Sequence, residues 1–124
     1  MFFSSPGGHK CINRGDFTPD DFEVGDFTTN DVWQTLSLAT ILPVGCTSFI
    51  CSIVGKTPDV GKYCYFKRKG DINDKNTFVL NTQVGDVLIK HCVILFCNKD
   101  REIEYTAEDT VWTALSLNVS GWFI

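Results

Sequence analysis

The sequence predicts an all-β protein, an eight-stranded antiparallel jelly-roll-like β-sandwich that follows an extended N-terminal arm. Three observations favour this fold. Short apolar segments alternate in period 2, turn-forming residues recur roughly every dozen residues, and no segment has the spacing of an amphipathic helix. An immunoglobulin-like sandwich is the alternative, but the Cys…Trp…Cys spacing of antibody domains is missing.

The chain divides into an arm and one domain. Residues 1–21 are rich in Ser, Pro, Gly and Asp without periodicity, and they form the predicted arm, whereas residues 22–124 form the predicted β-sandwich. The expected strands are residues 22–27, 32–39, 46–54, 62–69, 77–83, 86–97, 102–106 and 110–124. The connections carry Pro, Gly, Asn and Asp, as in Pro43-Val44-Gly45 and Val84-Gly85-Asp86, which favour turns.

The alternation within strands predicts which side chains face the core. In the last strand one parity comprises Val111, Leu115, Leu117, Val119 and Phe123, and in the second strand it comprises Val32, Leu36 and Leu38. Trp33, Trp112 and Trp122 have the opposite parity and are expected on outer faces. The strand around Leu88 to Cys97 is apolar on both parities, so we expect the opposite sheet to cover one face and the arm or a neighbouring subunit to cover the other.

The composition excludes several classes of partner. A net charge of -4 argues against non-specific binding to nucleic acid or to anionic lipid. No apolar run approaches the roughly 20 residues of a membrane span. The first residues, MFFSSPGGHK, lack the charged and long apolar regions of a secretory signal peptide. We therefore expect no nucleic-acid partner, no membrane insertion and no signal peptide.

Six cysteines are candidates for disulfides or for a tether of the arm: Cys11, Cys46, Cys51, Cys64, Cys92 and Cys97. Buried free thiols are the main expectation, and one or two disulfides are the alternative. The Cys46/Cys51 and Cys92/Cys97 spacings place each pair on opposite faces of a strand and do not match zinc knuckles. Cys11 is a candidate tether to a core or neighbouring thiol.

The arm also contains Arg14-Gly15-Asp16, the tripeptide that integrin receptors bind in adhesion proteins. No second cysteine lies close enough in sequence to close it into a small rigid loop, and Arg-Gly-Asp also suits an ordinary turn because Gly adopts positive φ readily. We interpret the tripeptide as a turn.

No catalytic chemistry is predicted. His91 adjoins Cys92, and neighbouring strand residues point to opposite faces, which makes a Cys–His dyad geometrically poor. His9 lies in the arm. The motifs of hydrolases, phosphate-binding loops and zinc proteases are missing. We expect no enzyme activity, no cofactor and no metal site.

The aromatic residues Trp33, Trp112 and Trp122, with Phe2 and Phe3 of the arm, are the candidates for an interface or a ligand site. Aromatic side chains on the outer face of a strand serve either as interface anchors or as a platform on which sugars stack. Interface packing is the first interpretation and glycan binding the second.

Dispersed motifs carry a resemblance to a known group. They are the basic aromatic turn at residues 66–70, residues 98–105 (NKDREIEY), the closing Gly-Trp-Phe at 121–123, the Trp-x-x-Leu-x-Leu strand at 33–38 and the Pro-x-Gly turn at 43–45. Over roughly residues 32–124 the chain resembles small virus- and phage-associated β-sandwich proteins.

This resemblance implies a structural component of a tailed-phage particle, either a capsid decoration (cement) protein or a tail-associated head domain. The implied partners are further copies of the chain, for example in a trimer, and the major capsid or tail protein. The implied location is the virion, assembled in the host cytoplasm. Two alternatives stay open: a glycan- or receptor-binding head of a tail fibre, and a self-assembling extracellular fibre subunit.

Overall fold

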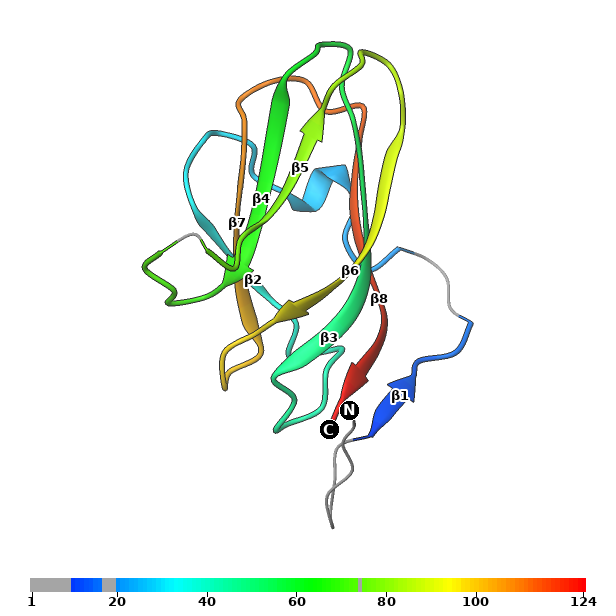
Figure 1. Cartoon of the computed structure of the whole chain (residues 1–124), viewed down its shortest axis with the longest axis vertical. Helices are drawn as coiled ribbons and strands as arrows, with labels where there is room; N and C mark the ends of the chain where they lie inside the picture. Colours follow the sequence, from blue (N-terminus) through cyan, green and yellow to red (C-terminus); the bar gives the residue numbers. More distant parts are fainter. Residues whose placement is uncertain (1–9, 17–19, 74) are drawn as a thin grey trace.

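The chain folds into two four-stranded antiparallel sheets that pack face to face (Figure 1). A computed structural model describes residues 10–16, 20–73 and 75–124. The first sheet has the order β1-β8-β3-β6 and the second the order β2-β7-β4-β5. Each sheet thus interleaves strands from both halves of the chain, as a jelly roll does. The predicted eight-stranded jelly-roll-like sandwich is confirmed.

The strands of the first sheet are β1 (Cys11–Asn13), β8 (Ala114–Phe123), β3 (Ser48–Lys56) and β6 (Ile89–Phe96). Those of the second are β2 (Gln34–Ser37), β7 (Glu102–Ala107), β4 (Lys62–Arg68) and β5 (Phe78–Thr82). The one helical element among the described residues is the 3-10 turn η1 (Val24–Asp26). Seven of the eight predicted strands are present, with shorter or shifted ends.

The strand predicted at residues 22–27 is wrong, because η1 occupies this segment. The Glu23 backbone N–H donates to the Asp26 carboxylate at 2.9 Å, which closes a local turn instead of a ladder. Only a single bridge, between Phe22 and Leu117, joins the segment to β8. Phe27 nevertheless enters the core, where its ring lies edge-on to Tyr105 at 5.0 Å.

The arm contributes a strand that the sequence did not predict. β1 pairs with β8, and Lys10 and Ile124 exchange two backbone hydrogen bonds of 2.7 and 2.9 Å. Beyond β1, the Arg14 guanidinium donates to the Asp21 carboxylate at 2.5 Å and to the Val119 carbonyl at 3.1 Å. Backbone pairing and this ion pair therefore attach the described part of the arm to its own sandwich.

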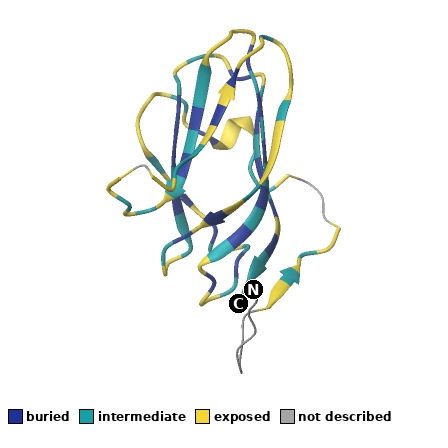
Figure 2. Cartoon of the chain, viewed as in Figure 1, coloured by how far each residue is buried: buried dark blue, intermediate teal, exposed yellow. Residues whose placement is uncertain are grey.

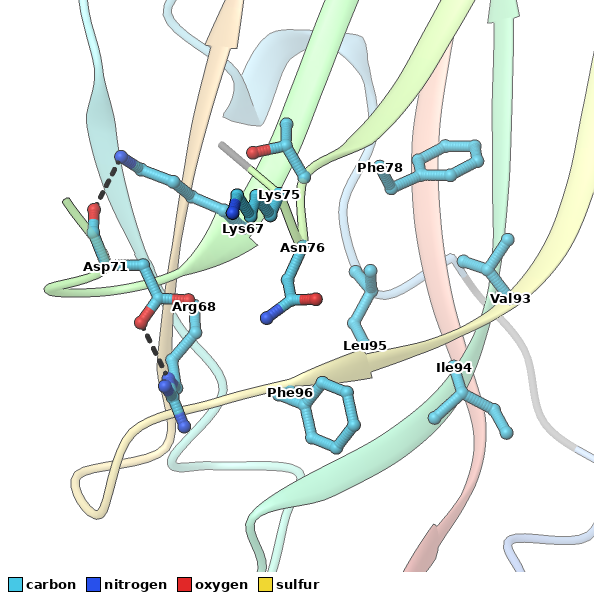
Figure 3. Close-up of a pocket in the computed structure, with 11 residues that line it drawn as sticks. Lys67, Arg68, Asp71, Lys75, Asn76, Phe78, Val93, Ile94, Leu95 and Phe96 are labelled. Carbon is cyan, nitrogen blue, oxygen red and sulfur yellow. Dashed lines mark hydrogen bonds and ion pairs between the residues drawn. The ribbon is translucent and has the colours of Figure 1, made fainter. Parts of the chain in front are cut away.

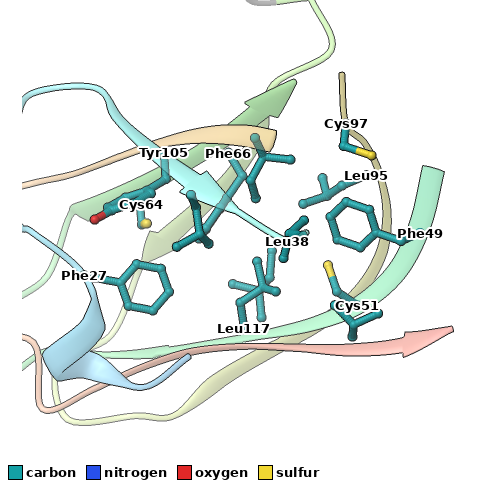
Figure 4. Close-up of a cluster of buried hydrophobic side chains, with 14 of the residues drawn as sticks. Phe27, Leu38, Phe49, Cys51, Cys64, Phe66, Leu95, Cys97, Tyr105 and Leu117 are labelled. Atoms are coloured by element: carbon teal, nitrogen blue, oxygen red, sulfur yellow. The ribbon is translucent and has the colours of Figure 1, made fainter. Parts of the chain in front are cut away.

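The core lies between the two sheets, and β3 supplies its centre (Figure 4). Along β3 the burial alternates strictly, and Phe49, Cys51 and Ile53 are fully inaccessible to solvent. Phe66 of β4 and Ile103 of β7 lie buried in the facing sheet. Figure 2 shows the same alternation of buried and less buried positions along the strands. This pattern is the period-2 signature from which the fold was predicted.

The predicted parity of β8 holds only in its middle. Leu115, Leu117 and Val119 are buried as expected. Between Val119 and Gly121 the register with β3 shifts, because Ser120 is an extra residue opposite Ile50 and Cys51. Past this bulge the faces exchange, so Trp122 pairs with buried Phe49 on the inner face, and Phe123 lies on the outer face.

The expected positions of Val111 and Trp112 are also wrong. The strand begins only at Ala114, and the preceding loop turns Trp112 inward, leaving Val111 69% exposed. The Trp112 indole N–H donates to the Glu108 carbonyl at 3.0 Å, so its polar atom is satisfied in a buried setting. Trp112 is a core residue.

Substitutions on the two faces of β6 should change the free energy of unfolding by very different amounts. Leu95→Ala should lower the free energy of unfolding by about 2–5 kcal/mol, because Leu95 is buried in the core. Ile94→Ala, one residue earlier on the exposed face, should change it by less than about 0.5 kcal/mol. Urea denaturation of the two variants beside the unmodified chain provides the measurement, and equal losses would contradict the assignment of faces.

Candidate assembly surface

Strand β6 is an edge strand whose second side is unpaired among the described residues. It pairs with β3 alone. The Cys97 backbone N–H donates to the Thr47 carbonyl at 3.0 Å. This hydrogen bond fixes which residues of β6 direct their backbone groups toward β3. Because backbone groups alternate in direction along a strand, Cys92, Ile94 and Phe96 point their N–H and C=O groups away from β3. These groups form an open template for another strand.

The outer face of β6 carries large apolar side chains. Ile94 is 55% exposed and Phe96 is 53% exposed. Ile94 pairs with Ile50, and Phe96 pairs with Ser48, whose partner on the other side is Phe123. Directly paired residues share a face, so Ile50, Ile94, Phe96 and Phe123 form a surface that we call the outer apolar patch.

The described part of the arm does not cover this patch. β1 lies at the opposite edge of the first sheet, with β8 and β3 between it and β6 (Figure 1). Among the described residues, the inner face of β6 packs in the core through Leu95, while its outer face is uncovered. Coverage of that outer face by a neighbouring subunit stays a prediction.

A groove of about 460 Å³ runs beside β6, between it and the start of β5 (Figure 3). Phe78, Val93 and Leu95 supply an apolar wall, and Lys67, Arg68 and Lys75 lie at its basic end. Two of these cations contact Asp71. Lys67 donates to the Asp71 carbonyl at 2.8 Å and Arg68 to its carboxylate at 2.9 Å. Of these two contacts, the one from Arg68 is an ion pair, whereas Lys67 bonds a neutral backbone carbonyl, so the groove rim keeps a positive character.

The predicted aromatic candidates do not form one surface. Trp112 is buried, and Trp122 packs against the core on the inner face of the first sheet. Trp33 alone lies on an outer face, that of the second sheet, where the Lys67 ammonium sits 4.3 Å from its ring centroid. Phe2 and Phe3 lie outside the described residues. A platform built from all three tryptophans is ruled out by this arrangement.

The structure gathers a different aromatic group that sequence reasoning missed. Tyr63 and Tyr65 alternate with the buried residues of β4, so they share the outer face of the second sheet, and their rings stack at 4.6 Å. The Tyr63 hydroxyl donates to the Asp31 carboxylate, and this hydrogen bond raises the pKa of Tyr63 to about 12. The signal was present in the sequence as two aromatic residues spaced by two within a strand.

The six cysteines divide by burial, and none forms a disulfide. Cys46, Cys51, Cys64 and Cys97 are buried, which confirms the main expectation for these four. Desolvation raises the pKa of the Cys51 thiol to about 12 and that of Cys97 to about 11, and it also raises the pKa of Cys64. The remaining two, Cys11 and Cys92, are exposed and lie on the two edge strands of the first sheet.

Two predictions about cysteine geometry need correction. Cys46 lies in the turn before β3, so it is buried together with Cys51 rather than on the opposite face. Cys92 and Cys97 do differ, one exposed and one buried. The predicted tether from Cys11 to a core thiol is wrong, because Cys11 is a free, exposed thiol and backbone pairing and the Arg14–Asp21 ion pair hold the described part of the arm. A link from Cys11 to a thiol of a neighbouring chain stays a prediction. The Arg14–Asp21 ion pair also engages the arginine of the Arg-Gly-Asp tripeptide within the fold.

The described residues contain no group of three or more His, Cys, Asp or Glu side chains that could hold a metal ion. His91 is exposed and lies edge-on to the Phe78 ring at 5.4 Å, while His9 lies outside the described residues. Within the described ranges, no helix is long and apolar enough to cross a membrane. The most distinctive surface is therefore β6 with its patch and groove.

The sequence matches no protein-family model, and a comparison with curated proteins finds no match.

The burial of the thiols predicts selective reactivity. At pH 8 a thiol reagent such as Ellman's reagent should modify two of the six cysteines rapidly, Cys11 and Cys92, because the other four are buried. Peptide mapping after labelling identifies the sites, and labelling in urea gives the total. Rapid reaction of Cys51 or Cys64 in the folded chain would contradict the structure.

Proposed function

We propose that the protein is a structural component of a bacteriophage particle, a decoration or cement protein that oligomerises and stabilises the capsid surface. The observation that supports this proposal most is the outer apolar patch beside the open side of the edge strand β6. Contiguous exposed apolar surface is typical of interaction sites. Jelly rolls commonly serve as capsid domains, although the same fold also occurs in lectins and other proteins.

The energetics of the patch suit a surface that is covered after folding. Ile94 and Phe96 are each about half exposed, so covering both contributes roughly 1–1.5 kcal/mol per side chain. One such contact is weak, but a lattice repeats it at every copy, and repeated contacts multiply avidity. The proposed role needs neither a catalytic residue nor a cofactor.

This proposal predicts that Phe96→Lys weakens incorporation into particles. A charge at the centre of the patch should reduce the amount of the chain that co-sediments with purified particles, since a covered ammonium group is costly to desolvate. Val60→Lys is the matched control, because Val60 is an exposed apolar residue in the turn before β4. The heat resistance of particles made with each variant provides a second measurement.

The decisive comparison uses particles made without the chain. The cement function predicts that they release their genome at a lower temperature and regain resistance when the purified chain is added. Particles that never contain the chain, or that are complete and equally heat resistant without it, would contradict the proposal.

A second candidate function, a glycan- or receptor-binding head of a tail fibre, has one specific observation in its favour. Trp33, Tyr63 and Tyr65 lie on the outer face of the second sheet, with Asp31 and Lys67 held beside them. Aromatic faces flanked by polar groups suit the stacking of sugar rings. This candidate uses the sheet opposite to the outer apolar patch.

The glycan candidate predicts binding on a glycan array that Tyr65→Ala and Trp33→Ala reduce by at least about tenfold, a loss of about 1.4 kcal/mol. Val44→Ala is the control, because Val44 is exposed and aliphatic and lies in the turn between β2 and β3, outside the aromatic group. If the unmodified chain binds no glycan on the array, or if all three variants bind equally well, this candidate function is contradicted.

A further inference from the structure

Within the part of the chain that the structure describes, the first sheet has an open edge at β6 and another at β1. At one edge β6 directs the backbone groups of Cys92, Ile94 and Phe96 outward, as shown above. At the other edge Lys10 and Ile124 bond each other reciprocally, which sets the phase of β1. Cys11 and Asn13 therefore direct their backbone groups away from β8.

The directions of the two edge strands are complementary. Three antiparallel pairings separate β1 from β6: β1 with β8, β8 with β3, and β3 with β6. β1 and β6 consequently run antiparallel to each other. A second copy in the same orientation, placed beside the first, would present its β1 antiparallel to β6 with both outer faces on the same side.

The register of the two edges also agrees. Cys11 pairs with Phe123, Phe123 with Ser48, and Ser48 with Phe96, so Cys11 and Phe96 lie in one row across the sheet. The next row with outward backbone groups joins Asn13 to Ile94 through Gly121 and Ile50. Unstaggered addition of a second copy thus pairs outward groups with outward groups, and each such pair exchanges two hydrogen bonds.

The charges of the two edges are opposite. Along the β1 edge, residues 10–16 and 20–26 carry two basic and five acidic side chains, a net charge of -3. On the β6 side, three basic side chains and one acidic side chain line the groove (Lys67, Arg68, Lys75 and Asp71), and β6 adds Lys90, a net charge of +3. Two β6 edges facing each other would bring like charges together, whereas β1 facing β6 brings opposite charges together.

We propose that copies of this chain associate head to tail, with β1 of one copy pairing with β6 of the next so that the first sheet continues across the interface. The proposal rests on the assembly role proposed above and names the partner at this edge as a second copy. An interface between two different surfaces closes into a ring or continues as a filament, and the twist between copies decides which. The outer apolar patches of neighbouring copies then lie on the same side of the continued sheet, with Cys11 and Asn13 of β1 between them.

Site-directed disulfide formation between two differently marked chains tests this pairing. One chain carries Cys92→Ser and keeps the exposed thiol of Cys11. The other carries Cys11→Ser, Cys92→Ser and Phe96→Cys and bears a mass tag. Hydrogen-bonded partners in antiparallel strands have Cα atoms about 5.5 Å apart, within the range that a disulfide spans. The buried thiols should not interfere, because their burial suppresses reaction.

The expected result is a mixed disulfide-linked dimer after mild oxidation. Its yield should exceed by about tenfold that of a control in which Val79→Cys, exposed on β5 of the other sheet, replaces Phe96→Cys. Mixed dimers no more abundant than in this control, or dimers formed only between identical chains, would overturn head-to-tail pairing. Analytical ultracentrifugation of the unmodified chain checks independently that self-association rises with concentration and falls in high salt.

The particle and cross-linking experiments distinguish a failure of the proposed cement function from a failure of the proposed β1–β6 interface. A chain found on particles that gives no mixed dimer retains the cement function without this interface. A chain that pairs head to tail but is found on no particle retains the interface and favours a self-assembling fibre subunit instead.

Discussion

The double pairing of β3 is the constraint on which the rest of the structure depends. β3 pairs with β8 along one side and with β6 along the other, and its inward side chains Phe49, Cys51 and Ile53 form the centre of the core. β3 is therefore an inner strand, and β6, which among the described residues pairs with β3 alone, is an edge strand. The alternation along β6 then places Leu95 in the core and Ile94 and Phe96 outside.

This arrangement lets one strand serve both folding and association. Burial of Leu95 stabilises the single chain, while the exposed side chains and outward backbone groups of its neighbours remain available to a partner. Soluble proteins usually protect such edges with charges, bulges or short strands. In β6 this protection is only partial, because the strand contains one charged residue, Lys90, near its start, whereas the four residues from Val93 to Phe96 are apolar. An edge of this composition fits a chain whose native state includes a partner.

Much of the fold could be predicted from the sequence because period-2 alternation and turn residues are local signals. β1 was not predictable in this way, since three residues in a polar segment carry no periodicity and their pairing depends on β8, over a hundred residues away. The faces of Trp122 and Phe123 exchanged at the Ser120 bulge, which alternation alone cannot reveal. Of the candidate site, the doubly apolar β6 was found from sequence, whereas the grouping of Trp33 with Tyr63 and Tyr65 required the pairing of distant strands.

Amide hydrogen exchange at single-residue resolution tests the central claim most directly. The backbone N–H groups of Ile94 and Phe96 point to the open edge, whereas that of Leu95 points to β3. In dilute solution the first two should exchange rapidly and Leu95 slowly. At assembling concentrations the account predicts that Ile94 and Phe96 become protected together with Cys11 and Asn13 on the opposite edge. Assembled chains in which Ile94 and Phe96 still exchange rapidly would contradict it.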